Sequence, residues 1–407
     1  MRRVVVTGMS GITALGTRWP EIQENMKAGK TATRYMPEWE RYSLHTKLAA
    51  PLEGIDLTHL YPRKKTRTMG PISLMAVRAS EMALENAGLI GDKVLSSGRT
   101  GVAYGSSWGS VEPVMDFAEL MTTGSSHKLS ATSYVRMMSH TTAVNIGMFF
   151  GLTGRVIPTS SACTSGSQAI GYAYETIRMN RQDVMIAGGA EELSVSEAAV
   201  FDTLYATSCE NAAPERSPRP FDRDRDGLVI GEGSTSFVLE DYDRAKARGA
   251  TIYAEVVGFG TNADGNHITQ PQASTMEQAL RLALEDADLT ADAIDFVSAH
   301  GTATDSGDAA ESRATFAVFG KQVPIHALKS YFGHTLGACG AMESWLAIEM
   351  MRSNWFAPTA NLVNPDEKCA DLDYVFGSPR VLAAEYVMNN NFAFGGINTS
   401  LIFRHPE

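Results

Sequence analysis

The sequence predicts an α/β protein with mainly parallel, buried sheets. Short runs rich in β-branched residues alternate along the whole chain with longer amphipathic runs, several of which end at glycine. Such alternation is typical of strands connected by helices. The alternation continues through both halves, no Pro/Ser-rich linker divides them, and the pattern permits two similar α/β layers. A chain of 407 residues is too long for one ordinary core and predicts two or three domain-sized units.

In the first half of the chain, apolar runs with many β-branched residues predict strands, and amphipathic runs predict helices. Two of these helices stop at Gly88 and Gly249, because glycine readily takes the left-handed conformation that ends a helix. The expected strands span residues 2–8, 100–106, 154–162, 183–192 and 233–240. The expected helices span residues 70–89, 143–152, 165–180 and 241–249.

The second half repeats this alternation. Its last predicted helix is apolar nearly all round, which is typical of a helix buried on every side. The longest irregular segment, 209–227, is of a length often found in functional loops. Strands are expected at 251–260, 293–302, 323–330 and 398–404, and helices at 275–289, 306–320 and 334–353.

Bulk composition excludes several classes of protein. The formal net charge of −11 argues against binding nucleic acid or a membrane surface as the main activity. The sequence contains no long uncharged apolar run that would predict a transmembrane helix, and the run at Val4–Val6 is too short for a signal peptide. We therefore expect a cytoplasmic protein. The four cysteines (163, 209, 339 and 369) have no metal-type spacing, so we expect free thiols and no metal site.

The segment "YPRKKTR" is a local exception to the acidic composition. It places Arg63, Lys64, Lys65 and Arg67 close together. Such a run is often only a solvated surface. If it has a function, its partner should be acidic.

The glycines of "VVVTGMSGITALG" suggest a dinucleotide-binding turn, but the pattern fits poorly. Gly8, Gly11 and Gly16 do not have the GxGxxG spacing, and no convincing acidic partner for a ribose follows. We expect these glycines to form a tight turn after the first strand.

Cys163 stands in "RVIPTSSACTSGSQAIGYAYE", where an extended segment ends and a helix begins. A thiol at a helix N-terminus experiences the positive end of the helix dipole, which favours the thiolate. Gly166 and small neighbours permit a sharp turn that exposes Sγ, as in nucleophile elbows. This stretch alone leaves two interpretations open, a nucleophile or a buried core thiol.

Further polar residues occur at the ends of later predicted strands. His300 and Lys329 each lie at the carboxyl end of a predicted strand, and His334 precedes a Gly-rich helix start. Glu343 lies in an otherwise apolar helix, so it needs a partner, for which Lys329 or a histidine is suitable. The glycines at 395 and 396 can let backbone N–H groups point inward, as an oxyanion hole requires.

Five segments together resemble the signatures of the β-ketoacyl-acyl-carrier-protein synthases, which are the ketosynthases of the thiolase superfamily. They are "PTSSACTSGSQAIG", "PFDRDRDGLVIGEG", "SAHGTATDSGDAAE", "LKSYFGHTLGACGAME" and "NNNFAFGGINTS". The resemblance covers essentially the whole chain. The resemblance to the type II fatty-acid elongating enzymes is strong throughout. The sequences around Cys163 and His334 are also similar to those of the ketosynthases of aryl-polyene clusters.

The resemblance implies a duplicated thiolase-like core of five αβαβα layers. Residues 1–250 would form the half that carries the nucleophile, and residues 251–407 the half that carries both histidines. It also implies a dimer, either of like subunits or with a second ketosynthase-like subunit.

The implied reaction is a decarboxylative Claisen condensation. Cys163 would take an acyl chain from the 4'-phosphopantetheine thioester of a carrier protein, and the enolate of malonyl-carrier protein would attack it. His300 and His334 would be neutral and would donate from Nε2 to the malonyl thioester, while Lys329 and Glu343 would orient His334. The N–H groups of Cys163 and Phe394 would form the oxyanion hole, and Phe394 would be a gate. No metal or tightly bound cofactor is implied.

The same resemblance assigns the basic run, Arg63, Lys64, Lys65 and Arg67, to docking of an acidic acyl carrier protein. Three aromatic residues depart from the elongating enzymes, namely Trp108, Tyr331 and Phe332, and Ala393 replaces a glycine before Phe394. They predict an acyl pocket with aromatic walls and an unsaturated or aryl-primed substrate. The alternative is that they are neutral packing variants.

Three other functions are less compatible with the sequence. A non-catalytic, pocket-shaping subunit would lack the cysteine, whereas this chain keeps Cys163, His300 and His334. A thiolase would carry a second catalytic cysteine near the C-terminal glycine loop, but "NNNFAFGGIN" contains none. A dinucleotide-dependent oxidoreductase is disfavoured by the glycine spacing.

Overall fold

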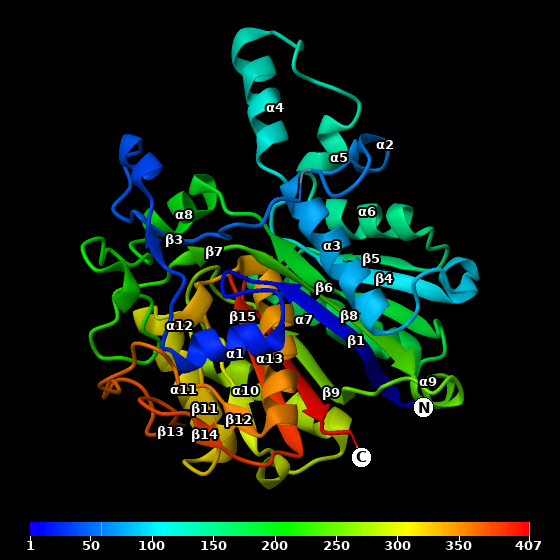
Figure 1. The fold of residues 1–407 in the computed structure, drawn as a ribbon. Helices are drawn as coiled ribbons and strands as arrows, with labels where there is room; N and C mark the ends of the chain where they lie inside the picture. The colour runs from blue at the N-terminus through cyan, green and yellow to red at the C-terminus, as the bar shows by residue number, and fades with distance from the viewer. Residues whose placement is uncertain (58, 407) are drawn as a thin grey trace.

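A sheet of eleven strands forms the centre of the computed structural model, which describes residues 1–57 and 59–406 (Figure 1). Its strand order is β13-β11-β10-β15-β16-β9-β1-β8-β6-β4-β5. In the first half of the chain these strands are β1 (Val4–Ile12), β4 (Thr100–Gly105), β5 (Val156–Thr159), β6 (Val184–Glu191) and β8 (Gly233–Asp241). In the second half they are β9 (Ala254–Ala263), β10 (Phe296–Ser298), β11 (Pro324–His326), β13 (Asp373–Tyr374), β15 (Tyr386–Ala393) and β16 (Ile397–Arg404).

The strand order shows that the core is duplicated. From the middle outward, the first half runs β1-β8-β6-β4-β5 and the second runs β9-β16-β15-β10-β11. In both halves the inner pairs are antiparallel and the outer pairs are parallel. The halves meet where Val4, Val5 and Val6 of β1 pair with β9. The expected duplication is therefore present.

Five layers result from the way the long helices cover this sheet. The helices α7 (Ser165–Arg178) and α13 (Cys339–Ser353) pack against each other and against strands of both halves, so they form the middle layer (Figure 1). Outside the first half lie α3 (Pro71–Asn86) and α6 (Thr141–Phe150). Outside the second half lie α10 (Ala273–Ala287) and α11 (Asp305–Phe319).

The middle layer explains the apolar composition of α13. Met342, Leu346 and Met350 are fully buried, and Trp345 is nearly so. A helix between two sheet layers has no solvent-facing side, so every position can be apolar. The sequence prediction of a helix buried all round is correct here.

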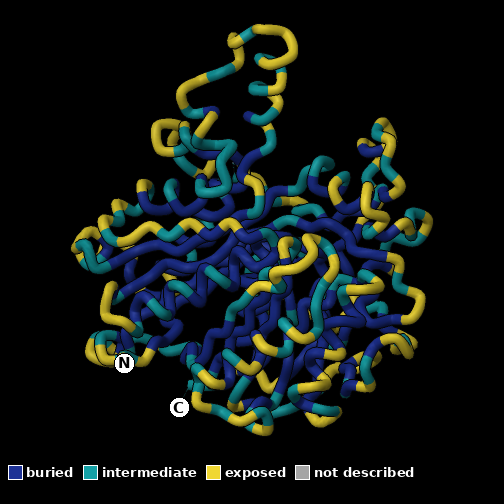
Figure 2. Tube along the Cα trace, turned by 180° about the vertical axis from the view of Figure 1, so that it is seen from behind, coloured by how far each residue is buried: buried dark blue, intermediate teal, exposed yellow. Residues whose placement is uncertain are grey.

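The remaining elements lie outside this five-layer core. They include the helices α1 (Trp19–Lys27), α2 (Arg63–Thr66), α4 (Glu112–Thr123), α5 (Ser133–Met137), α8 (Val195–Asp202), α9 (Tyr242–Ala247) and α12 (Lys329–Phe332). Two small sheets contain β2 (Arg34–Tyr35), β3 (Leu48–Ala50) and β7 (Ile230–Gly231), and β12 (Trp355–Phe356) and β14 (Arg380–Val381). The segment with α4 and α5 projects from the body, and Figure 2 shows it as largely exposed or half-buried. Among the described helices, none has the length and apolar content to cross a membrane.

Two sequence expectations about the fold are wrong. The sheet is mixed rather than mainly parallel, because β15 and β16 are joined by only three residues, and so short a connection forces antiparallel pairing. Of the three glycines expected to form a turn, only Gly16 does so, in a turn closed by two backbone hydrogen bonds with Thr13, whereas Gly8 and Gly11 lie inside β1. A Cβ on Gly8 would meet the Ala83 carbonyl oxygen of α3 at 2.2 Å, so this glycine permits a close approach between strand and helix.

Candidate active site

Cys163 lies on a tight connection between β5 and α7. A short 3₁₀ turn, η3 (Ala162–Thr164), joins them, and Ala162 has a φ of 50°, which is unusual for a residue with a side chain. A Cβ on Gly166 would meet the Ala341 backbone nitrogen at 2.9 Å, so glycine lets α7 pack closely on α13. This geometry is that of the expected strand-turn-helix elbow, with the thiol at its tip.

His300 follows β10, at the carboxyl end of that strand. Glu311 of α11 fixes the backbone here, because its two carboxylate oxygens accept the N–H groups of His300 and Gly301, both at 2.7 Å. Burial raises the pKa of Glu311 to about 8, and these two hydrogen bonds oppose the shift. The sequence analysis did not identify Glu311. Its sequence signal is its place as the last residue of the segment "SAHGTATDSGDAAE", which follows His300 into the helix.

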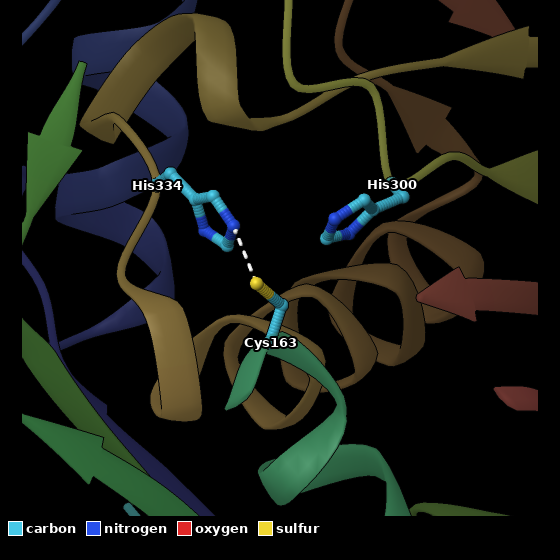
Figure 3. A group of neighbouring side chains, drawn as sticks. All are labelled: Cys163, His300 and His334. Carbon is cyan, nitrogen blue, oxygen red and sulfur yellow. Dashed lines mark hydrogen bonds between the residues drawn. The ribbon is translucent and has the colours of Figure 1, made fainter. Parts of the chain in front are cut away.

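His334 approaches Cys163 from the second half of the chain. Its Nε2 lies 3.1 Å from Cys163 Sγ, and its Nδ1 accepts the backbone N–H of Leu336 at 3.2 Å. The ring centroids of His300 and His334 are 5.2 Å apart. Figure 3 shows both imidazoles facing the sulfur from opposite sides. The structure therefore brings together three side chains that are far apart in the sequence.

Lys329 contacts His300, whereas we expected it to orient His334. Its ammonium donates to His300 Nδ1 at 3.1 Å, to the His300 carbonyl oxygen at 2.6 Å and to Glu343 Oε1 at 2.5 Å. Lys329 therefore contacts the other histidine, and Glu343 lies beside Lys329. The reason is topological, since α12 begins at Lys329 beside the end of β10, while His334 lies beyond the end of α12.

Asn391 completes this buried network, and sequence reasoning missed it. Its Nδ2 donates to Glu343 Oε2 at 2.6 Å and lies 3.4 Å from His300 Nδ1. The Cys339 thiol lies beside it and donates to the carbonyl oxygen of Cys163 at 3.2 Å. Asn391 was hidden in a run of asparagines whose strand, β15, the sequence analysis did not predict.

The hydrogen bonds settle the tautomer of each histidine. An ammonium and a backbone N–H only donate, so His300 Nδ1 and His334 Nδ1 are acceptors and carry no proton. Burial and the charge of Lys329 lower the pKa of both histidines well below the ordinary value. Both rings are therefore neutral near pH 7 and carry their proton on Nε2, which faces the cavity.

The Cys163 thiol is less acidic than the helix start suggested. Burial raises its pKa to about 11, although Lys329 and the backbone N–H groups of Phe394 and Cys163 lower it. Burial outweighs the effect of these neighbours because only 4% of the residue is exposed, so the resting group is a thiol. The same two N–H groups lie near Sγ, where an oxyanion hole would need them.

The turn between β15 and β16 presents Phe394 rather than its glycines. The N–H of Gly395 donates to the Ile268 carbonyl and that of Gly396 to the Ala393 carbonyl, so neither points toward the thiol as we expected. Both glycines have positive φ, 88° and 69°, which the tight turn requires. The Phe394 ring packs on Phe201 with centroids 4.9 Å apart.

A cavity leads from the surface to Cys163. Its wall combines the site itself with Phe201 of α8, Leu204 just after that helix, the 264–271 segment and residues that follow His300, among them Thr302 and Thr304. Thr302 and Thr304 bring two hydroxyls to the wall, bonded to each other at 2.9 Å. Sequence reasoning did not single out these two threonines.

The aromatic residues predicted to wall an acyl pocket do not lie together. Tyr331 and Phe332 are buried in the main hydrophobic core, and neither lines the cavity at Cys163. Their backbone lies close to His334 in sequence, but α12 turns their side chains into the core. That part of the prediction is wrong. Trp108 is 37% exposed and follows Ser107, which is hydrogen-bonded to Glu191.

The basic run lies on the surface around α2. Arg63, Lys64, Lys65 and Arg67 are all exposed. The Lys65 ammonium lies 4.7 Å from the centre of the Phe149 ring. The other three side chains extend from the same short helix and the residue after it, so their charges are available to a partner.

The donor set does not fit a metal ion in this hydrogen-bonded state. Cys163, His300 and His334 each offer one ligand atom, all within 4.8 Å of one another. A neutral histidine that binds a metal through Nε2 carries its proton on Nδ1, whereas both Nδ1 atoms here are acceptors. A second group, His300, Cys339 and Glu343, lies around the Lys329 ammonium, which already supplies a cation.

Solved structures with the same architecture include the crystal structure of a beta-ketoacyl synthase from Burkholderia phymatum, which is 62% identical, with full coverage of both chains and a TM-score of 0.99. A type II polyketide ketosynthase in complex with its acyl-carrier protein is 29% identical, also with full coverage of both chains, at a TM-score of 0.88. Fold and site thus define a condensing acyltransferase with a thiolase-like core.

Sequence comparison gives the family. The N-terminal domain of beta-ketoacyl synthase matches residues 1–245 and its C-terminal domain matches residues 253–363. A 3-oxoacyl-[acyl-carrier-protein] synthase 2 of Vibrio cholerae is 36% identical, and the match covers 99% of each chain. The chain belongs to the beta-ketoacyl synthase family.

Proposed function

We propose that the enzyme condenses an acyl group held on Cys163 with malonyl-acyl-carrier protein. The observation that carries this proposal is the placement of two neutral imidazoles, each with an Nε2–H, around one buried thiol. A non-catalytic, pocket-shaping role does not need these three groups together.

In the first stage the thiol exchanges with a carrier-protein thioester. The bond from the acyl carbon to the pantetheine sulfur breaks, a bond to Cys163 Sγ forms, and the thiol proton goes to the departing pantetheine sulfur. The N–H groups of Cys163 and Phe394 stabilise the negative carbonyl oxygen of the tetrahedral intermediate. A neutral resting thiol suits this exchange, because its proton is available to the leaving group.

In the second stage His300 and His334 donate from Nε2 to the malonyl thioester oxygen. Carbon dioxide leaves, the enolate carbon attacks the acyl carbonyl, and the bond to Cys163 Sγ breaks. The freed thiolate regains a proton from solvent. Lys329 and Glu343 act through His300, since the ammonium keeps its Nδ1 an acceptor and leaves Nε2–H as the donor.

Both substrates arrive on the 4'-phosphopantetheine arm of an acyl carrier protein. The cavity that passes Thr302 and Thr304 gives this arm a path to Cys163, and the arm would find hydroxyl partners there. Arg63, Lys64, Lys65 and Arg67 give the acidic carrier protein a docking surface. No tightly bound cofactor takes part.

The two halves, 1–250 and 251–407, share one site in this proposal, and the protein acts in the cytoplasm as a dimer. The edge strand β5 supports self-association, because Val156 is exposed and has no strand beyond it among the described residues. Met148 of α6, packed beside β5, is also 65% exposed. The partner is a like subunit or a second ketosynthase-like chain.

The acyl substrate in this proposal is an unsaturated or aryl-primed chain. Tyr331 and Phe332 lie in the core, and Trp108 is not among the described residues that line the cavity at Cys163, so the proposal now depends on the sequence resemblance alone. Comparable turnover of saturated and aryl-polyenoyl chains would count against it.

Intact-mass analysis tests the mechanism. After incubation with an acyl-carrier protein, the mass should increase by one acyl group that peptide mapping places on Cys163, and Cys163→Ala should remain unmodified. His300→Ala and His334→Ala should still be acylated while condensation falls by at least about 100-fold, the usual loss for such donors. If both variants condense normally, the assigned roles are wrong.

A further inference from the structure

Two buried carboxyl groups beside Cys163 have no place in the mechanism above. Glu191 is the last residue of β6 and is fully buried. Glu197 lies in α8 and is 2% exposed. A buried carboxyl is costly unless its oxygens have partners, so each needs an explanation.

Each of these carboxyls has one occupied and one unoccupied oxygen. Glu191 Oε2 accepts from the Ser107 N–H, the Ser107 hydroxyl and the Gly337 N–H. Glu197 Oε2 accepts from the Ser194 N–H at 3.1 Å. Neither Oε1 has a hydrogen-bond partner among residues 1–57 and 59–406.

The adjacent Glu192 shows that the fold can satisfy a carboxyl in this region. Its Oε2 accepts from the Ser110 hydroxyl and the Ile72 N–H, and its Oε1 accepts from the Val111 N–H. Both oxygens of Glu192 therefore have protein partners. The free oxygens of Glu191 and Glu197 are a specific feature of this pair.

Glu191 lies close enough to the nucleophile to affect its pKa, and Glu197 lies in the helix that contributes Phe201 to the cavity wall. Glu197 and Phe201 are four residues apart in α8, so they share one helix face, and Phe201 lines the cavity and packs on Phe394. Ala198 and Phe201 belong to the same hydrophobic cluster as Cys163. Glu191 is bonded to Gly337, in the turn after His334, and its charge raises the pKa of Cys163.

The two carboxyls differ in protonation. Burial raises the pKa of Glu191 to about 7, and burial together with the charge of Glu191 raises the pKa of Glu197 well above its ordinary value. Near pH 7, Glu197 is therefore a carboxylic acid that can donate, and Glu191 is available as an acceptor. A hydroxyl group both donates and accepts, so it can satisfy both free oxygens, whereas a carbonyl can satisfy only one.

We propose that Glu191 and Glu197 bind a hydroxyl group on the acyl chain that Cys163 carries, so that the enzyme selects hydroxyl-bearing acyl groups. This inference rests on the proposed function, because the chain must be attached to Cys163. It names a substrate feature that the condensation chemistry itself does not require.

The test uses carrier proteins loaded with saturated chains of increasing length, each ending either in a hydroxyl or in a methyl group. Condensation rates with malonyl-acyl-carrier protein give kcat/KM for each chain. At the best accepted length, the wild-type enzyme should prefer the hydroxyl chain by about tenfold or more, the cost of leaving a buried polar pair unmatched. Glu197→Leu should reverse the preference, and Glu197→Gln should keep part of it.

Glu192→Gln is the matched control, because it alters a buried carboxyl whose oxygens are already occupied. It should lower the melting temperature without changing the preference ratio. Equal use of the two chains by the wild-type enzyme, or an unchanged ratio in a folded Glu197→Leu, would overturn the inference. Condensation of the methyl chains would still occur in that case, so the proposed function would stand independently.

Discussion

Proton positions at individual residues decide what this site can do. His300 and His334 each keep one ring nitrogen as an acceptor, from Lys329 and from the Leu336 N–H, and this fixes their other nitrogen as a donor. Cys163 is a thiol at rest because burial outweighs the nearby positive charge. The site can therefore stabilise negative charge that develops on substrate oxygens, and Cys163 is protonated before substrate binds.

The raised pKa of Cys163 predicts how alkylation depends on pH. Only the thiolate reacts with iodoacetamide. As long as the pH is below the thiol pKa of about 11, each rise of one pH unit increases the thiolate fraction about tenfold. The inactivation rate should therefore still rise between pH ~8 and ~10. Lys329→Met removes a charge that lowers this pKa, so alkylation should be slower at every pH in that range. A rate that levels off below pH ~8 would contradict the neutral resting thiol.

Sequence reasoning located the residues whose role depends on local context. Cys163 could be found because an elbow is a local feature, and the two histidines because each follows or precedes a recognisable element. Asn391 was missed because its importance comes from Glu343, which is distant in the chain, and Glu311 because its contacts depend on how the turn after β10 folds back onto α11. Tyr331 and Phe332 were misassigned for the complementary reason, since closeness to Lys329 in sequence does not determine where a side chain points.

The site also depends on how closely three elements approach one another. The carbonyl oxygen of Gly337, in the turn after His334, would lie 2.3 Å from a Cβ on Gly189 of β6 and 3.0 Å from one on Gly166 of α7. Both are glycines because a strand, a helix and a turn meet there with no room for side chains. This packing holds His334 at its distance from Cys163.

A pair of glycine substitutions tests this packing. Gly189→Ala should push the Gly337 turn away, destabilise the protein by about 2 kcal/mol or more, and slow condensation. Gly147→Ala is the matched control in α6, where a new Cβ meets nothing closer than 4.0 Å. It should stabilise the protein by up to about 1 kcal/mol, because alanine favours a helix more than glycine does. Urea unfolding and condensation rates measure both effects. Equal stability of the two variants would contradict the close-packing argument.

Helices and strands were predictable to different degrees. The long helices α3 and α10 were found because their apolar periodicity reflects burial on a fixed face, and α13 because its long apolar run reflects burial on every side. The strand β15 was missed because its centre, Asn389 to Asn391, is polar, and the reason for those asparagines lies in the hydrogen-bond network of the middle layer. The mixed strand directions follow from connection lengths, which apolar patterning alone does not reveal.

The duplicated architecture explains why the site lies at the centre of the protein. The first half supplies Cys163 in the turn before α7, and the second half supplies His300, His334 and the network on α13 and β15. Neither half contains a complete site. The chemistry depends on the middle layer, where α7 and α13 join the two halves, and substrates must reach it through a cavity from the surface.

The overall negative charge of the enzyme opposes the approach of an acidic carrier protein. The enzyme has a formal net charge of −11, so an acidic carrier protein is repelled on average and needs a local positive surface. The exposed run around α2 is such a surface. Each exposed ion pair contributes up to about 1 kcal/mol, so reversal of two charges should weaken docking by about tenfold.

The double substitution Arg63→Glu and Lys64→Glu tests this docking surface and leaves Lys65 on its aromatic neighbour. We expect KM for acyl-carrier protein to rise by about tenfold, while kcat changes little, because the residues lie away from Cys163. The same variant should use an acyl-pantetheine thioester normally, since that substrate carries no protein. The exposed Lys93→Glu, outside the run, serves as the charge control.

Added salt should reduce the difference between the variants, because ions screen exposed charges beyond about 10 Å at ~0.1 M. An equal loss with both substrates would instead indicate damage to the site, and an unchanged KM would mean that the carrier protein docks elsewhere.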